Sequence, residues 1–243
     1  ILEESEVLDT KKILSYVRRA CDQYEMIEDG DVIAVGVSGG KDSLALLVAL
    51  YEMRRFYPKH YDLFALTVDM GLPDMDFSGV AELCRRLGIP YYTEKTEISN
   101  IIFNIRKEAN PCALCAKMRR GVLHQTAKRL GATKVAFGHH FDDVVETFML
   151  NLFFEGRIGC FQPKTYLSRT DITLIRPFVL LPEKEIRSFV KKAGLPVVET
   201  TCPADKNSER LRMKELLRRL EQENHGLRNR VFGAIRRGHV DGF

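Results

Sequence analysis

The sequence predicts an α/β fold: a doubly wound parallel sheet of about five strands, with further helices at the N- and C-terminal ends. Runs of apolar and β-branched residues alternate with longer segments of helical spacing, which is typical of βαβ units. Glycine or proline follows most of the helical segments and so separates the units. A chain of 243 residues is long enough for one such domain with an appendage, or for two small domains.

The expected elements follow one another along the chain. A helical segment is expected first, and then a strand over residues 32–37 that leads into a helix ending near residue 56. Further strands are expected over residues 61–69, 89–94, 134–138 and 173–176, and further helices over residues 77–87, 114–130, 139–154, 183–193, 206–223 and 227–237. Residues 197–201 read as a short extended segment. We group these elements into an N-terminal helical segment (1–28), a central domain (29–203) and a basic C-terminal helical segment (204–243).

The strand over residues 32–37 ends in a glycine turn, Ser38-Gly39-Gly40-Lys41-Asp42-Ser43, and an apolar helix follows directly. Such a turn presents backbone N–H groups and the positive end of a helix dipole, both of which suit a phosphate. Gly39 and Gly40 have no Cβ to keep a ligand away, Lys41 adds a positive charge, and the two serine hydroxyls can donate. The spacing differs from the Walker A and dinucleotide patterns. The alternative is an ordinary strand-to-helix turn.

Two more polar segments directly follow expected strands. Val68 and Asp69 end one strand, and Gly138 and His139 end another. The carboxyl ends of parallel strands meet at one edge of a sheet, where ligands bind at the switch point. We therefore expect all four residues beside the bound nucleotide, with His139 contacting it.

Asp142 and Asp143 open the helix that follows. In one interpretation they cap the helix start. In the other, a carboxylate serves as a general base or holds Mg²⁺ on the phosphates. Adjacent helical residues point in different directions, so we expect one of the two to face the site, and the sequence does not distinguish them.

The six cysteines are expected to be thiols, ligands or catalysts, because the chain looks cytosolic. Cys112 and Cys115 stand at i and i+3 at a helix start, about 5 Å apart, which suits one metal centre. Alone they fit a redox pair, half of a zinc site or two corners of an iron–sulfur cluster. Cys202 is the third candidate. Three thiolates fit a [4Fe-4S] cluster with one open iron, whereas the alternative makes Cys202 a buried small hydrophobe.

Two arginines follow the C-x-x-C pair, and three further cysteines lie elsewhere in the sequence. Arg119 and the residue after it lie on the same helix as the C-x-x-C pair, where they would lower a thiol pKa or receive an anion. Cys21 and Cys84 lie on apolar helix faces and are expected in the core. Cys160 is left unassigned.

The net charge of +4 is mild, but basic residues gather after Asp205. The RNA-binding candidates are Arg210, Arg212, Arg218 and Arg219. A basic tail suggests a polyanion partner, and the alternative is a solvated helix face. No apolar run approaches the roughly 20 residues that span a bilayer. We therefore expect a cytoplasmic protein without a membrane partner.

Taken together, these residues resemble the tRNA 2-thiocytidine synthetase family, iron–sulfur-dependent tRNA thiolation enzymes of the ATP pyrophosphatase (PP-loop) superfamily. The matching segments are SGGKDS (38–43), CALC (112–115) with Arg-Arg-Gly (119–121) behind it, LGATKVAFGHHFDD (130–143), residues 146–153 and IRPF (175–178). The resemblance covers roughly residues 30–205. The glycine turn alone would indicate only the superfamily, and its combination with the cysteines is more specific.

The resemblance implies an adenine nucleotide alpha-hydrolase-like fold and a reaction in two steps. ATP adenylates an oxygen on a tRNA pyrimidine, and sulfur held on the open iron then displaces AMP. Residues 38–43 would bind ATP with Mg²⁺, and Cys112, Cys115 and Cys202 would bind the [4Fe-4S] cluster. Asp143 aligns with an acidic residue proposed to be catalytic in related 2-thiouridine enzymes. Those relatives have Lys at the position of Arg119. A catalytic role for Arg119 therefore requires that arginine replace this lysine.

The sequence departs from the family in two places. Cys202 stands alone where members often have a second C-x-x-C, and the zinc-finger cysteines of the 2-thiouridine branch are absent, which favours cytidine. The short C-terminus suggests tRNA contacts from the partner in a homodimer, and the sulfur donor is not identified. The alternatives are a PP-loop enzyme acting on a small molecule or a uridine, and a nucleotide-binding module with structural zinc.

Overall fold

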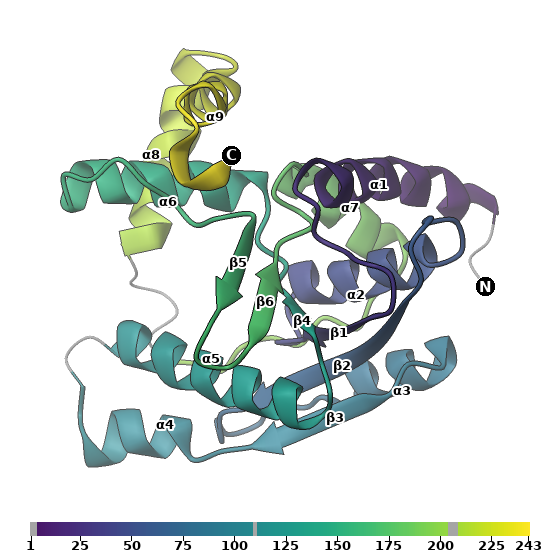
Figure 1. Ribbon diagram of the computed structural model, residues 1–243. Coiled ribbons are helices and arrows are strands. Elements are labelled where there is room, and N and C mark those ends of the chain that lie inside the picture. The colour runs from purple at the N-terminus through teal and green to yellow at the C-terminus, as the bar shows by residue number, and fades with distance from the viewer. Residues whose placement is uncertain (1–3, 109–110, 204–208) are drawn as a thin grey trace.

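A six-stranded sheet forms the centre of the computed structural model, which describes residues 4–108, 111–203 and 209–243 (Figure 1). The strand order is β3-β2-β1-β4-β6-β5. The parallel strands are β1 (Asp31–Gly36), β2 (Tyr61–Asp69), β3 (Tyr91–Lys95), β4 (Lys134–Ala136) and β6 (Ile172–Ile175), and β5 (Lys164–Leu167) is antiparallel to β6. The order reverses between β1 and β4, so a ligand site is expected beyond the carboxyl ends of these two strands.

Helices cover both faces of the sheet, as a doubly wound fold requires (Figure 1). The long helix α5 (Pro111–Arg129) lies across one face, with α4 (Ile98–Asn100) and the π-helix Ile101–Ile105 beside it. The other face carries α1 (Glu4–Gln23), α2 (Lys41–Met53), α3 (Ser78–Leu87) and α7 (Glu183–Lys192). Outside this layer, α6 (Phe141–Phe154) contacts α8 (Glu209–Glu223) and α9 (Leu227–Arg237), and the chain ends in the 3₁₀ turn Val240–Gly242.

The side chains of strand β1 show why helices must cover both faces of the sheet. Ile33 and Val35 point into the larger core with α1, α2 and α7, and Ala34 between them points into the smaller core under α5. All three side chains are fully buried. A central parallel strand is apolar on both faces for this reason, so its sequence is a continuous apolar run. Cys21 and Cys84 are buried in the larger core, as predicted.

The structure differs from the sequence prediction at three segments. The antiparallel edge strand β5 was not predicted, because Lys164–Leu167 is short, half-exposed and lacks an apolar run. Residues 197–201, expected as a short extended segment, belong to no strand. The first basic helix was expected from residue 206; α8 begins at Glu209, and residues 204–208 lie outside the described part of the chain. No helix among the described residues is both long and apolar enough to cross a bilayer.

Candidate active site

The predicted glycine turn is a compact loop between β1 and α2. The Ser43 hydroxyl donates to the carbonyl of Gly40 at 2.8 Å and accepts the N–H of Ser38 at 3.2 Å. Gly39 has a φ of +83°, a left-handed conformation that favours glycine. Among the described residues, no side chain caps the start of α2 at Gly40. The first N–H groups of this helix are therefore available to an anion.

Lys41 is held by two carboxylates beside this loop. Its ammonium lies 2.8 Å from an Asp42 oxygen and 3.0 Å from Glu183 Oε1. Burial alone would lower the pKa of Lys41, but the hydrogen bonds and charges of these two acids outweigh burial and raise it. The lysine is therefore a fixed positive charge at the start of α2.

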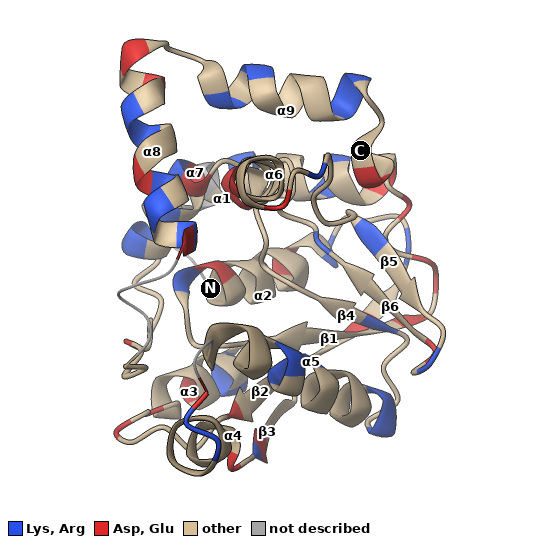
Figure 2. Cartoon of the chain, turned by 90° about the vertical axis from the view of Figure 1, so that its left-hand side faces the viewer, with Lys and Arg blue, Asp and Glu red and all other residues tan. Residues whose placement is uncertain are grey.

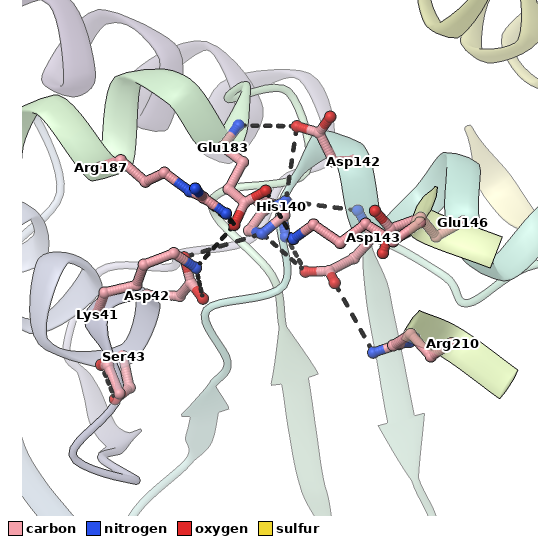
Figure 3. Close-up of polar contacts among 12 residues, drawn as sticks. Lys41, Asp42, Ser43, His140, Asp142, Asp143, Glu146, Glu183, Arg187 and Arg210 are labelled. Atoms are coloured by element: carbon pink, nitrogen blue, oxygen red, sulfur yellow. Dashed lines mark hydrogen bonds and ion pairs between the residues drawn. The ribbon is translucent and has the colours of Figure 1, made fainter. Parts of the chain in front are cut away.

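Glu183 is a site residue that the sequence prediction missed. It lies at the start of α7, is 8% exposed, and accepts hydrogen bonds from Arg187 (2.9 Å) and Lys214 (2.8 Å) besides its contact with Lys41 (Figure 3). Burial by itself raises the pKa of Glu183, but the hydrogen bonds of these cations prevail and hold it well below its usual range. The sequence offered only an acid at a helix start, a common dipole partner.

His140 lies between the start of α6 and the glycine turn, and it was also missed as a site residue. Its Nε2 is 3.4 Å from Asp143 and 3.8 Å from Asp42 (Figure 3). Its Nδ1 accepts the N–H of Asp143, and Asp143 accepts the N–H of His140 at 2.9 Å, which makes a capping box. Gly138 allows this approach, because a Cβ there would lie 2.9 Å from the backbone of Asp42.

The two adjacent aspartates have different surroundings. Asp142 accepts the backbone N–H of Glu183 and a hydrogen bond from Arg228, each at 2.8 Å. It therefore ties α6 to α7 and α9. Asp143 faces His140 Nε2 and has an ion pair of 3.7 Å with Arg210. Of the two aspartates, Asp143 is the one that lies near His140 Nε2, the same nitrogen that faces the carboxylate of Asp42 in the glycine turn.

The other residues expected beside the nucleotide lie at the carboxyl ends of their strands. Val68 and Asp69 end β2 and are half-buried, and Asp69 accepts the N–H of Gly71 at 2.9 Å. His139 follows β4, where its ring lies between Phe137 and Phe161. Burial, then the charge of Arg176, lowers the pKa of His139 to about 3, so this imidazole is neutral at physiological pH.

The segment before Cys202 runs beside the glycine turn. The N–H of Val198 donates to the carbonyl of Gly39 at 3.0 Å, and the hydroxyl of Thr201 donates to the carbonyl of Pro73 at 2.8 Å. A Cβ on Gly39 would lie 2.8 Å from the Cβ of Val198. Cys202 therefore sits against the loop that follows β2.

The two thiols of the C-x-x-C pair lie near the same loop. Cys112 and Cys115 occupy the first turn of α5, and Cys115 Sγ is 3.4 Å from the sulfur of Met70. Burial raises the pKa of Cys115; Arg119 opposes this rise, and the charges of Cys202 and Cys112 add to it. Cys202 is half-exposed, unlike the core cysteines. Within the described residues, no three His, Cys, Asp or Glu side chains are arranged to hold a single metal ion.

Lys and Arg residues occur along α8 (Figure 2), and their side chains have different partners. Arg210 turns toward α6, where it contacts Asp143 and donates to Thr147 at 2.9 Å. Arg212 is exposed and pairs with Glu209 on its own helix. Arg218 and Arg219 are exposed. The structure thus brings one of the four predicted RNA-binding arginines to the candidate site and leaves three on the surface.

Comparison with known proteins identifies the family of this chain. A family model described as PP-loop domain matches residues 11–220. A tRNA-cytidine(32) 2-sulfurtransferase of Geobacter sulfurreducens is 40% identical over 228 residues, which cover 93% of this chain and 89% of that protein. The corresponding protein of Pelobacter propionicus is 40% identical over 232 residues, covering 94% and 86%.

Two solved structures share the fold. One is the U34-tRNA thiolase NcsA from Methanococcus maripaludis with its [4Fe-4S] cluster, with a TM-score of 0.79, 23% identity, and coverage of 96% of this chain and 79% of that chain. The other is the NMN synthetase from Francisella tularensis, with a TM-score of 0.54, 15% identity, and coverage of 98% and 96%. At these identities the likeness concerns the fold alone.

Proposed function

This chain belongs to the PP-loop domain family and, within it, to the tRNA-cytidine(32) 2-sulfurtransferases, and from that premise we propose that it transfers sulfur to cytidine 32 of a tRNA at the expense of ATP. One observation carries the proposal. The glycine turn at Gly39, the carboxylate of Asp143 and the three thiols gather around one edge of the sheet. Phosphate binding, acid–base chemistry and sulfur chemistry therefore have neighbouring sites.

The glycine turn would bind ATP through the uncapped start of α2. The free N–H groups there, and the hydroxyls of Ser38 and Ser43, suit the pyrophosphate oxygens. Lys41 would exchange one of its carboxylate partners for phosphate. Mg²⁺ prefers carboxylate oxygens, and Asp42 and Asp143 both lie within 3.8 Å of the same imidazole nitrogen. These two acids would hold Mg²⁺ on the phosphates.

The first step would make the cytosine oxygen a good leaving group. The base O2 attacks the α-phosphorus of ATP, the bond to the β-phosphate oxygen breaks, and pyrophosphate leaves along the glycine turn. Lys41 would stabilise the departing negative charge from its fixed position. Asp142 is already bonded to Glu183 on α7 and Arg228 on α9 and so holds these helices to α6. We therefore propose Asp143 as the catalytic carboxylate.

The three thiols fit a [4Fe-4S] cluster better than a zinc ion. Structural zinc sites are almost always four-coordinate, whereas three thiolates suit a cluster that leaves one iron without a protein ligand. Among the described residues, Cys112, Cys115 and Cys202 are the thiols that come near one another at this edge of the sheet. A cluster with one iron free of protein ligands would supply the sulfur nucleophile that displaces AMP. Arg119 lies one turn beyond Cys115 and would favour its thiolate.

Iron and sulfide analysis with a thiolation assay tests the proposal. Protein purified without oxygen should contain about four irons per chain. With ATP, Mg²⁺, inorganic sulfide and an unmodified tRNA transcript it should form 2-thiocytidine and pyrophosphate. Cys202→Ala should lose iron and product, whereas Cys84→Ala, a core cysteine, should keep both. Zinc in place of iron would overturn the cluster, and thiolation of uridine would overturn the substrate.

The remaining parts of the proposal concern assembly and location. The central domain (29–203) would perform the chemistry, and Arg212, Arg218 and Arg219 on α8 would contact tRNA phosphates from the C-terminal segment. We also propose a homodimer, which light scattering tests, and a cytoplasmic location, where tRNA is modified.

A further inference from the structure

A line of aromatic and cationic side chains crosses the active edge of the sheet. It runs from His124 on α5 through Phe137 and His139 after β4 and Phe161 to Arg176 after β6, and we name these five residues the ring ladder. Successive ring centroids are 6.2, 5.8 and 5.0 Å apart, and the Arg176 guanidinium lies 5.1 Å from the Phe161 centroid. Four separate chain segments contribute to it. All five residues are half-buried.

Three polar atoms of the ring ladder have no hydrogen-bond partner among the described residues. They are His124 Nε2, His139 Nδ1 and Arg176 Nε, each shielded from solvent. Leaving such an atom unsatisfied is unfavourable, and buried polar groups in proteins are normally paired. Three of them in one cluster indicate a ligand that supplies donors and acceptors. Both imidazoles have lowered pKa values, chiefly through burial, so each offers one donor and one acceptor.

The two arginines at the ring ladder form no ion pair with an acid among the described residues. His124 and Arg176 stand at the two ends of the ladder. Burial lowers the pKa values of both, and the nearby charge of Arg120 lowers them further. In the part of the chain that the structure describes, neither Arg120 nor Arg176 has a carboxylate partner; their hydrogen bonds go to carbonyl and hydroxyl oxygens. Two neighbouring guanidinium groups without an acid suit a phosphate.

The ring ladder lies between the two reactive parts of the proposed active site. His139 directly precedes His140, and it feels the charges of Asp143 and Arg210. At the other end, Arg120 and His124 lie on α5, about one and a half and two and a half turns beyond Cys115. A base held on this ladder would have the phosphate-binding loop on one side and the thiols on the other.

We propose that the ring ladder binds the target pyrimidine nucleotide of the RNA, with the base against Phe161 and His139 and a flanking phosphate on Arg120 and Arg176. This inference rests on the proposed function and assigns the substrate-binding residues. Single-stranded RNA is commonly bound by bases stacked on aromatic rings and by arginines on phosphates. The unpaired atoms of His124 and Arg176 can form hydrogen bonds with the bound nucleotide.

A double-mutant cycle tests the proposal by binding affinity alone. Phe161 is altered in the protein and the target base is removed from the RNA, separately and together. The probe is a fluorescein-labelled anticodon stem-loop with cytidine or an abasic site at position 32, measured by anisotropy on the apo protein. Phe161→Leu and the abasic site should each weaken binding about 5- to 150-fold, as expected for one stacked base. Combined, they should weaken it no further than either alone. Multiplicative losses would overturn the contact.

The exposed Arg120 gives a second variant that leaves the ladder intact. Arg120→Gln should reduce the slope of log K against log salt by about 0.7, the value for one single-strand phosphate. The controls are Phe56→Leu, at the far end of α2 and 48% exposed, and Arg85→Gln on α3, and both should bind like the wild type. An unchanged slope in Arg120→Gln would overturn the phosphate contact.

Thiolation by the wild type is measured in parallel to separate the two proposals. If the wild type forms 2-thiocytidine but the cycle shows no coupling between Phe161 and the base, the ring ladder assignment is wrong and the proposed function stands. If the cycle shows coupling and no 2-thiocytidine forms, the ladder binds RNA and the proposed function falls.

Discussion

Replacing Glu183 by glutamine tests how Lys41, the lysine proposed to bind phosphate, is held in place. The variant keeps the shape of the side chain but removes the charge that three cations share. Its partner side chains are exposed to different degrees: 29% for Lys41, 36% for Lys214 and 60% for Arg187. A charge-assisted hydrogen bond contributes about 1.5–3 kcal/mol when protected, and exposed pairs contribute under about 1 kcal/mol.

From these exposures we expect a loss of about 2–3 kcal/mol in the free energy of unfolding of Glu183→Gln at pH 7, mostly from Lys41 and Lys214. A chain of this size should then melt about 4–12 °C lower. The assay is urea unfolding followed by circular dichroism. Glu185→Gln on the same helix is the control, because its pair with Lys12 involves a side chain that is 55% exposed. It should lose less than about 1 kcal/mol.

The difference in the free energy of unfolding between the wild type and Glu183→Gln should also shrink as the pH falls. The pKa of Glu183 is lowered in the folded protein, whereas in the unfolded chain it is about 4.3. The stabilisation is therefore complete above about pH 5 and is lost as the pH falls toward the folded pKa. A difference under about 0.5 kcal/mol at pH 7, or one that stays constant to about pH 3, would refute the reasoning.

Three further predictions follow from single contacts. Gly39→Ala should weaken ATP binding about tenfold in a thermal-shift titration, because its φ is +83° and its Cβ would meet Val198 at 2.8 Å; unchanged affinity would contradict this. Lys134→Met should lower the free energy of unfolding in urea by about 3 kcal/mol, because it leaves the buried Asp31 unpaired, and a neutral result would count against that pair. His139 should show no NMR titration between about pH 8 and pH 5, since its pKa is about 3; a midpoint near 6.5 would exclude its burial in the neutral form.

Local patterns were enough to predict the part of the site that follows the strands. The apolar run before Ser38 and the helix after Ser43 identify the glycine turn without any knowledge of distant residues. The same holds for the strand over Tyr61–Asp69, whose bounds agree with the prediction. Parallel strands then bring Asp69 and Gly138 to one edge, because topology alone fixes where their carboxyl ends lie.

The partners of buried charges could not be predicted in this way. Glu183 gains its role from Lys41 and Lys214, which lie 142 residues before it and 31 residues after it (183 − 41 and 214 − 183). No local period connects these positions. The ring ladder has the same character, since Phe161 lies in a loop and Arg176 follows a short strand. Such clusters depend on side-chain direction, which the sequence pattern does not specify.

The C-terminal helices were interpreted as a surface for RNA, but helical spacing divides α8 between two tasks. Arg210 and Lys214 are four residues apart and contact Asp143 and Glu183, respectively. Residues four apart share one face of a helix, so this face is committed to the acids of the active site. Arg212 lies on a different face and remains exposed. Because Arg210 and Lys214 offset part of the negative charge of Asp143 and Glu183, we propose that the C-terminal segment contributes to the electrostatics of the proposed ATP site as well as contacting RNA.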